Sequence, residues 1–339
     1  MKKILIYFLG FIFVCFILPI LFTKKDKEVS TTNDSGINDI EISKEESNGE
    51  PYNYEKYGTI KLLHLKTGVV EDVAIDNYLC NVVSAEMPAD FDIEALKAQA
   101  IVARTYTIYK INNRKHETAD ICDSSTCCQA WISKEDRLAR WDENLRENNW
   151  KKIEDAVNST KGKIITYQNE PINAFFHSNS GGKTEVPVNV WGGSGYPYLQ
   201  TVETSGEDAY TQYASEVVLS GQELIEKLKT KYNDITIDFS NTEDIKILEY
   251  TDGDRVKTVK FGNHNLSGVE TRTLLGLRSA NFTITQENGN IKFSVKGYGH
   301  GVGMSQTGAD SMAKQGSSAE EIVHHFYTDV EIKDVNDIV

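Results

Sequence analysis

The chain has 339 residues, of which 40% are hydrophobic and 25% are charged, a composition typical of a globular protein with a buried core. Its 36 Lys and Arg residues stand against 50 Asp and Glu residues, which gives a formal net charge of −14. These values exclude a wholly disordered chain and argue against a nucleic-acid partner bound through a broad basic surface.

The N-terminus carries an uncharged apolar run over residues 4–22, with two lysines before it and three soon after it. Its length is close to the roughly 20 residues that a helix needs to cross a bilayer. A cleaved signal peptide would have a shorter apolar region and a small-residue cleavage site, which residues 22–24 lack. We therefore predict an uncleaved single-pass membrane anchor over 1–25, whose orientation the near-even lysine balance leaves open.

Residues 26–56 are predicted to form an acidic flexible tether, because residues 26–50 are rich in Asp, Glu, Ser, Asn and Gly and almost free of aromatic residues. Residues 1–50 hold six lysines and eight acidic residues, or −2, so −12 of the net charge belongs to residues 51–339. The folded region is expected over 57–339, with a core part at about 65–165 and a groove-forming C-terminal part at about 166–339.

Helices and strands are predicted in irregular order through the folded region. Two strands around the Thr67-Gly68 turn lead into a helix, and a break at Met87-Pro88 precedes an alanine-rich helix capped by Asp90 or Asp92. The order favours a mixed α+β fold with two lobes around a groove rather than a doubly wound sheet. Further elements are predicted as helices at 143–160, 220–231 and up to about 327, and as strands at 163–167, 172–177, 245–250, 256–261 and 291–296.

Glu86 lies between apolar residues just before the break, where a regular helix is expected to end. In a partly desolvated cleft its pKa would rise toward neutrality, as a general acid requires; the alternative is a surface glutamate at a helix end. Lys97 and Arg104 follow it, seven residues apart and therefore on one helix face. They could bind an anionic group of a substrate or form surface salt bridges.

A possible metal site follows from the clustering of soft ligands within thirteen residues. Imidazole and thiolates at short spacing suit a structural, tetrahedral zinc ion held by His116, Cys122, Cys127 and Cys128. A disulfide from Cys122 to Cys127 or Cys128 is the competing assignment. A disulfide framework across the whole chain is not expected, because it has five cysteines only: Cys15, Cys80, Cys122, Cys127 and Cys128.

Two further clusters, FHSNSGG at 176–182 and GYGHGVGMSQ at 297–306, are polar and rich in glycine. Glycine lets backbone approach a ligand closely, and Ser178, Ser180 and His300 suit hydrogen bonds to sugar hydroxyls. The second cluster is neither a Walker loop nor a dinucleotide fingerprint. A nucleophile such as Cys80 or Ser178 acting with His300 is an alternative that no nucleophile-elbow motif supports.

Four segments together resemble the stage II sporulation protein D family of endospore formers: SAEMPADFDIEALKAQAIVARTYT, FHSNSGGKTE, TRTLLGLRS and GYGHGVGMSQTGA. The resemblance runs from about residue 57 to residue 327. It implies a peptidoglycan lytic transglycosylase that acts in forespore engulfment, anchored in the mother-cell membrane with its folded region outside the cytoplasm. It also implies partners: stage II sporulation protein P, an amidase that strips stem peptides, and stage II sporulation protein M, a membrane scaffold.

The same resemblance implies roles for individual residues. Glu86 would be the single catalytic acid and base, Lys97 and Arg104 are the basic residues of its motif, and Ser178, Ser180 and His300 are groove candidates. Some members bind zinc through a His and Cys cluster, here His116, Cys122, Cys127 and Cys128, with Cys127 where a histidine is expected. The rival function is a non-catalytic, glycan-binding activator of a cell-wall amidase, and a Cys- or Ser-dependent peptidase is a third.

Overall fold

A β-hairpin opens the described chain and leads directly into the helix that ends at Glu86. The computed structural model describes residues 52–287 and 289–338, so the predicted anchor and most of the tether lie outside the described residues. β1 (Thr59–His64) pairs antiparallel with β2 (Val69–Ala74) and parallel with the short β3 (Ile121–Cys122). α2 (Ile75–Glu86) follows β2 without a break, as predicted. Within the described ranges, no helix combines the length and apolar character needed to cross a membrane.

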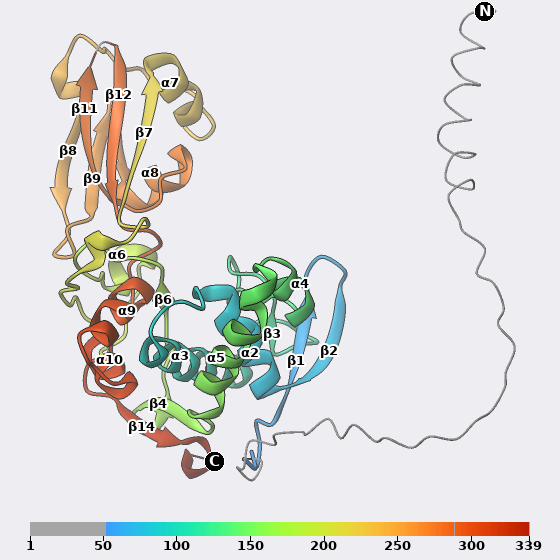
Figure 1. Ribbon diagram of the computed structural model, residues 1–339. Coiled ribbons are helices and arrows are strands. Elements are labelled where there is room, and N and C mark those ends of the chain that lie inside the picture. The colour runs from blue at the N-terminus through green and yellow to red at the C-terminus, as the bar shows by residue number, and fades with distance from the viewer. Residues whose placement is uncertain (1–51, 288, 339) are drawn as a thin grey trace, which may run out of the picture. The chain divides into compact units, whose positions relative to one another are not determined.

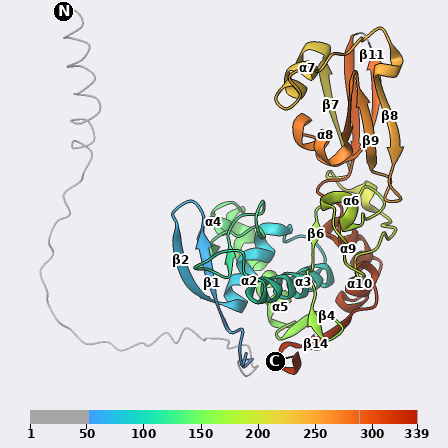
Figure 2. The ribbon, with the colours of Figure 1, turned by 180° about the vertical axis from the view of Figure 1, so that it is seen from behind.

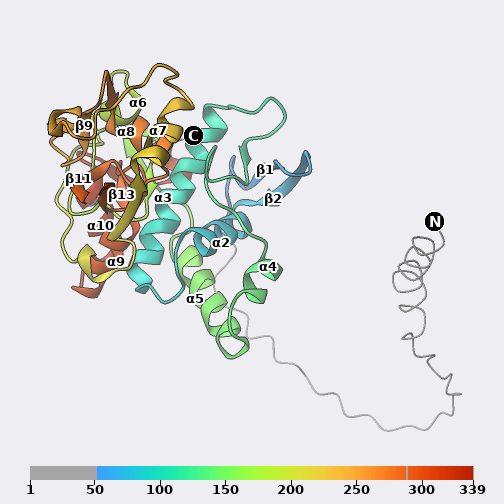
Figure 3. The same cartoon turned by 90° about the horizontal axis from the view of Figure 1, so that it is seen from above.

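The long helix α3 (Ile93–Asn112) is the centre of the larger hydrophobic core. Asp92 caps it by accepting a hydrogen bond from the Glu94 backbone N–H, which decides between the two predicted caps. Figures 1 and 3 show α2 and α5 (Arg146–Asn158) on one side of α3, and α9 (Gln306–Lys314) and α10 (Ala319–Phe326) on the other. The helix is therefore buried almost all round. The sequence pattern indicates only one buried face. The burial of the other faces cannot be seen from the pattern, because these faces carry polar side chains that are nevertheless buried.

Segments distant in sequence complete this larger core. β4 (Lys163–Tyr167) lies between β5 (Glu170–Pro171) and β14 (Glu331–Asp334) in an antiparallel sheet. The strand predicted over 172–177 is reduced to β6 (Phe176–His177), because its partner, the parallel β13 (Met304–Ser305), is only two residues long. The C-terminal helices thus share a core with the N-terminal ones, and the predicted division near residue 165 cuts across it.

Within the segment between α6 (Pro187–Trp191) and β13, residues 217–295 form a second hydrophobic core. This segment contains two three-stranded antiparallel sheets, ordered β10-β9-β8 and β11-β12-β7, several of whose strands are labelled in Figure 2. Both sheets contribute to one buried cluster that includes Phe261 and Phe293. α7 begins at a capping box formed by Ser220 and Glu223, at the start of the helix predicted over 220–231. The mixed α+β class is confirmed. The elements of this lobe are β7 (Ala214–Ser220), α7 (Gly221–Lys229), η5 (Thr242–Asp244), β8 (Ile245–Tyr250), β9 (Val256–Phe261), β10 (His264–Ser267), α8 (Gly268–Leu275), β11 (Asn281–Glu287) and β12 (Asn290–Lys296).

Short helices connect the remaining elements. Before α5 the chain forms α4 and a 3-10 turn, and these two segments matter because they line one side of the groove described below. Near the C-terminus, Ser318 with Glu321 forms the capping box of α10. The short helices are α4 (Lys134–Ala139), η3 (Glu143–Leu145), η4 (Glu207–Ala209) and η6 (Val335–Ile338).

Candidate functional site

Glu86 is the last residue of α2, and Pro88 follows where the helix ends. Burial raises the pKa of its carboxyl to about 6, although hydrogen bonds from the Ala130 N–H, at 2.5 Å, and from the Gln306 side chain act in the opposite direction. Its position at the negative end of the α2 dipole also disfavours the carboxylate. The pKa elevation predicted for a carboxyl in a desolvated cleft is therefore present.

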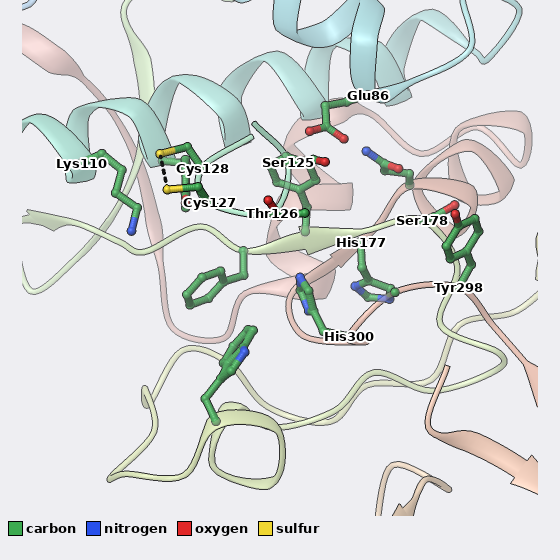
Figure 4. A pocket seen from close by; sticks show the side chains of 16 residues that line it. Glu86, Lys110, Ser125, Thr126, Cys127, Cys128, His177, Ser178, Tyr298 and His300 are labelled. Atoms are coloured by element: carbon green, nitrogen blue, oxygen red, sulfur yellow. Dashed lines mark hydrogen bonds between the residues drawn. The ribbon is translucent and has the colours of Figure 1, made fainter. Parts of the chain in front are cut away.

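Two cavities meet at Glu86. The first has a volume of about 670 Å³ and the second about 640 Å³, and the two share Glu86, Ser178 and Gln306 in their walls. Figure 4 shows the Glu86 carboxyl pointing from α2 into the first cavity, with His177 and His300 across from it. The shared residues make the cavities two arms of one groove, so a long ligand could pass the carboxyl on both sides.

The walls of the groove are aromatic and polar. The first arm is lined by Tyr106, Phe175, Trp191 and Tyr298, with Lys110 near its edge. Such walls suit sugar rings, which present apolar C–H faces to aromatic rings and hydroxyls to polar groups. The second arm is lined by Phe91, Arg137, Trp141, Leu145, Asn149 and Gln212 among others.

Carboxyl groups are scarce in this groove. Among the described residues, Glu86 is the only acidic side chain in the first arm, and the exposed Asp90 is the only other one in the second. Most glycosidases place two carboxylates about the scissile bond, one as the acid and one as the base or nucleophile. The arrangement here favours chemistry in which one carboxyl serves as both acid and base.

The two groove histidines are neutral. Burial lowers the pKa of His177 to about 3 and places the pKa of His300 well below its usual value. His177 Nδ1–H donates to the Val302 carbonyl at 3.1 Å, and the Val302 N–H donates to His300 Nδ1 at 3.0 Å. Neither imidazole can therefore supply a proton as an imidazolium near neutral pH, which leaves this role to Glu86.

Of the two predicted groove serines, only Ser178 lines the groove, where it belongs to both arms. The prediction for Ser180 is corrected: its side chain is fully buried and its hydroxyl donates to His177 Nε2 at 2.9 Å. Ser180 therefore fixes the His177 ring rather than contacting a ligand. Sequence proximity to Ser178 and the glycines gives no sign of this burial.

A buried glutamate that the sequence analysis missed ties the two glycine-rich clusters together. Glu207 accepts hydrogen bonds from the Ser180 and Gly182 backbone N–H groups and from the Ser305 and Thr307 hydroxyls. Its contacts join the loop after β6 to the start of α9, which carries Gln306. No motif marks Glu207, because its partners are distant in sequence.

The sequence predicts that the glycines of the two clusters let the backbone approach a ligand. In the structure they mainly let one loop pack closely against another. At Gly181, with φ +74°, a Cβ would lie 2.9 Å from the Lys296 backbone carbon. At Gly301, with φ +85°, it would collide with the guanidinium of Arg255. Arg255 is itself buried and donates to the Ser180 and Lys183 carbonyls at 2.9 Å, which joins the second lobe to the groove loop.

Lys97 and Arg104 lie away from the groove, and the expectation that they contact substrate is corrected. At 100° per residue, Lys97 and Arg104 lie about 180° and 200° around α3 from Tyr106, which lines the first arm. Lys97 Nζ pairs with Glu94 Oε1 at 2.7 Å. Among the described residues, neither cation contacts Glu86. The alternative hypothesis, that they order its carboxyl, is therefore not supported by a direct contact.

Arg104 has a structural environment. Its side chain is fully buried, and its Nη atoms donate to the Thr160, Val157 and Lys163 carbonyls at 2.7–3.3 Å, with Asp76 at 3.6 Å. The first two carbonyls belong to the C-terminal end of α5, where a cation is favoured by the helix dipole. Arg104 therefore holds α5 against α2 and α3.

The four predicted metal ligands are brought together. Their ligand atoms all lie within 4.8 Å of one another: His116, Cys122, Cys127 and Cys128. His116 Nε2 is 3.6 Å from Cys128 Sγ and 3.7 Å from Cys127 Sγ, and these two sulfurs are 4.0 Å apart, with all described cysteines as free thiols. Tetrahedral zinc with Zn–S of about 2.3 Å requires N–S separations of about 3.6 Å and S–S separations of about 3.8 Å. The donor set therefore fits zinc.

The alternative nucleophiles are poorly placed. Cys80 is buried in the larger core, outside both arms of the groove, and burial raises the pKa of its thiol to about 12. Ser178 and His300 both line the first arm, but no hydrogen bond joins them, and the His300 Nδ1 atom is engaged by the Val302 N–H. The geometry thus gives no activated nucleophile at these residues.

Comparison with known proteins identifies the relatives of this chain. A family model described as "Stage II sporulation protein" matches residues 64–167, a segment that contains Glu86 and the four cluster residues. Stage II sporulation protein D of Bacillus amyloliquefaciens is 32% identical over 343 residues, which cover 99% of this chain and 97% of that protein. Stage II sporulation protein D of Bacillus subtilis (strain 168) is 37% identical over 79% of this chain and 76% of that protein.

A further relative carries a different name. The amidase enhancer of Bacillus subtilis (strain 168) is 30% identical over 74% of this chain, a match that covers 39% of the enhancer. The relative from Bacillus amyloliquefaciens, by contrast, aligns over nearly its whole length. The chain therefore belongs to the stage II sporulation protein D family.

Proposed function

We propose that this sporulation protein is a peptidoglycan lytic transglycosylase that cuts denuded glycan strands between N-acetylmuramic acid and N-acetylglucosamine during forespore engulfment. The observation that carries the proposal is the position of Glu86, a carboxyl with a pKa of about 6 at the meeting point of two groove arms. Each arm is large enough for sugar rings, so a strand can extend to both sides of the bond that is cut.

The proposed chemistry needs one carboxyl. Protonated Glu86 donates its proton to the glycosidic oxygen as the bond to the muramoyl C1 breaks. Its carboxylate then takes the proton of the muramoyl C6 hydroxyl while that oxygen bonds to C1, which restores the acid and leaves a 1,6-anhydromuramoyl end. No water is consumed. With a pKa of about 6, about a tenth of the molecules carry the required proton at pH 7.

Glu86→Gln tests the catalytic assignment in the purified full-length protein. The amide keeps the shape of the side chain but can neither donate nor take the proton, so the variant should bind denuded strands and release no anhydro product. Asp90→Asn is the informative second variant, because a two-carboxylate hydrolase would need this residue. We expect Asp90→Asn to keep anhydro product formation within about tenfold. Loss of product in both variants would point to a two-carboxylate mechanism instead.

A second function is favoured by the relative whose name is amidase enhancer. In this alternative the groove binds glycan and activates a cell-wall amidase without cutting the strand. Purified, peptide-free strands incubated with this protein alone separate the two: the transglycosylase shortens them, whereas the activator leaves their length unchanged.

The proposal also includes a metal ion, two protein partners and a location. Zinc at His116, Cys122, Cys127 and Cys128 would be structural, because four protein ligands leave no open position for substrate. The proposed partners are stage II sporulation protein P, which would supply denuded strands, and stage II sporulation protein M as membrane scaffold. The apolar segment 4–22 would anchor the protein in the mother-cell membrane, with the groove facing the wall.

A further inference from the structure

The second arm of the groove contains a cation without a partner. Arg137 of α4 lines this arm, and its Nε atom is buried with no hydrogen-bond partner. Its guanidinium carbon lies 5.6 Å from the ring centroid of Trp141, which lines the same arm. A guanidinium stacked on an aromatic ring keeps its donors in the ring plane free for a ligand.

Two buried or neighbouring arginines, Arg104 and Arg114, have acidic partners, whereas Arg140 is exposed and Arg146 donates to the Trp141 carbonyl. Arg104 pairs with Asp76 and Arg114 with Asp120, at 3.6 and 2.9 Å. Among the described residues no carboxylate lies within salt-bridge distance of Arg137, and burial together with the charge of Arg140 lowers its pKa. In a region that carries −12, a groove cation left without a carboxylate is available to an anion brought by the ligand.

We infer that Arg137 binds the lactyl carboxylate of a muramoyl residue and thereby selects strands from which the stem peptides have been removed. This inference rests on the proposed function. A stem peptide is joined to the lactyl group through an amide, which has no charge and offers one oxygen. Amidase action leaves a carboxylate whose two oxygens match the paired donors of a guanidinium.

The place of Arg137 on one side of Glu86 fits the chemistry of the strand. Muramoyl residues alternate with N-acetylglucosamine, so a carboxylate recurs at every second sugar on both sides of the bond that is cut. A cation in the second arm can therefore meet a carboxylate whichever muramoyl residue occupies that arm. Arg140 is the natural control, because it lies at the C-terminal cap of the same short helix but is exposed and outside the groove lining.

The test measures strand binding in the full-length protein carrying Glu86→Gln, so that no strand is cut. The probes are denuded strands and the same strands with their carboxylates converted to methylamides. We expect the Glu86→Gln protein to bind the carboxylate strands about tenfold more tightly. Adding Arg137→Gln should remove this preference while affinity for the methylamide strands stays the same, and adding Arg140→Gln should keep the preference. Arg137→Lys should restore only part of it.

The outcomes separate the inference from the function on which it rests. If the protein without the Glu86 substitution releases anhydro ends but Arg137→Gln keeps the full carboxylate preference, the inference is wrong and the proposed function stands. If neither type of strand is bound and no anhydro end appears, the proposed function fails and the inference fails with it. Equal loss of affinity for both strands in Arg137→Gln would assign the residue to folding of the arm, which also contradicts the inference.

Discussion

The polar residues on the two faces of α3 make different kinds of contact. One face looks into the groove, where Tyr106 and Lys110 line the first arm and the Gln99 carbonyl lies 3.4 Å from the Gln306 amide nitrogen. The opposite face carries Arg104, which donates to carbonyls at and just after the end of α5, and Lys97, which pairs with Glu94 of the same helix. The two cations that follow Glu86 in the sequence motif thus have structural contacts, and the groove-facing residues of α3 lie about half a turn away from them.

Removal of the proposed zinc ion should have the largest effect, because it would act on stability and also on the first arm, which Cys127 and Cys128 line beside Tyr106. Zinc bound to the folded state only, at a free concentration a thousandfold above its Kd, would contribute about 4 kcal/mol. We expect metal analysis to give one zinc per chain, and a chelator to lower the unfolding temperature. Cys122→Ser should lose the metal, whereas Cys80→Ser should keep it. A metal-free protein with two fewer titratable thiols would instead indicate the disulfide.

Arg104→Met should be the most damaging substitution on the scaffold face. It leaves α5 without its C-terminal cation and leaves Asp76 with the Tyr54 hydroxyl but no cation, and the expected loss is about 3 kcal/mol of unfolding free energy. Urea denaturation measures this, and strand binding by the folded fraction should retain the carboxylate preference. If the Arg104→Met protein were stable but had lost the preference for carboxylate strands, Arg104 would be a ligand-binding residue instead.

Glu86→Gln should stabilise the protein at alkaline pH. The folded-state pKa of Glu86, about 6, exceeds the ordinary value of 4.5, so the charged form is penalised on folding. The gain is therefore up to about 2 kcal/mol above pH 7, and it shrinks as pH falls through 6 and vanishes near 4.5. Denaturation at pH 8 and at pH 4.5 measures the difference. If Glu86→Gln were less stable than the parent at pH 8, burial would not destabilise the Glu86 carboxylate.

The smallest stability effects are expected from a matched pair, one residue from each face of α3. Lys97→Gln removes a partly exposed pair with Glu94 and should cost about 0.5 kcal/mol, with no change in KM. Tyr106→Phe removes a hydroxyl in the groove wall and should raise KM about tenfold at nearly unchanged stability. If instead Lys97→Gln raised KM and Tyr106→Phe did not, the assignment of the two faces would be reversed.

Much of this arrangement is local and could be predicted from the sequence. Strand alternation, the Asp92 cap and the Ser220 capping box lie within a few residues of the elements that they define. Glu86 could be singled out because Pro88 ends its helix, and the four metal ligands because they cluster within thirteen residues. These features could be predicted because the residues that determine them lie close together in the sequence.

The features that could not be predicted depend on contacts between distant segments. Which face of α3 meets the groove is decided by α9 and the loop after β6, whose places no local pattern specifies. Ser180 is buried because Glu207 and His177 bind it, and Arg137 reaches the groove through the fold around α4. Trp141 lies beyond the end of α4, so helix spacing does not pair it with Arg137 in the sequence.

In the proposed mechanism, Glu86 cuts the strand without water. Digestion of denuded glycan in water labelled with heavy oxygen, followed by mass spectrometry of the new ends, distinguishes this reaction from hydrolysis. We expect 1,6-anhydromuramoyl ends that carry no label and that are missing when Glu86→Gln replaces the parent protein. Labelled reducing ends would mean hydrolysis, and unlabelled anhydro ends made equally well by Glu86→Gln would mean that another residue does the chemistry.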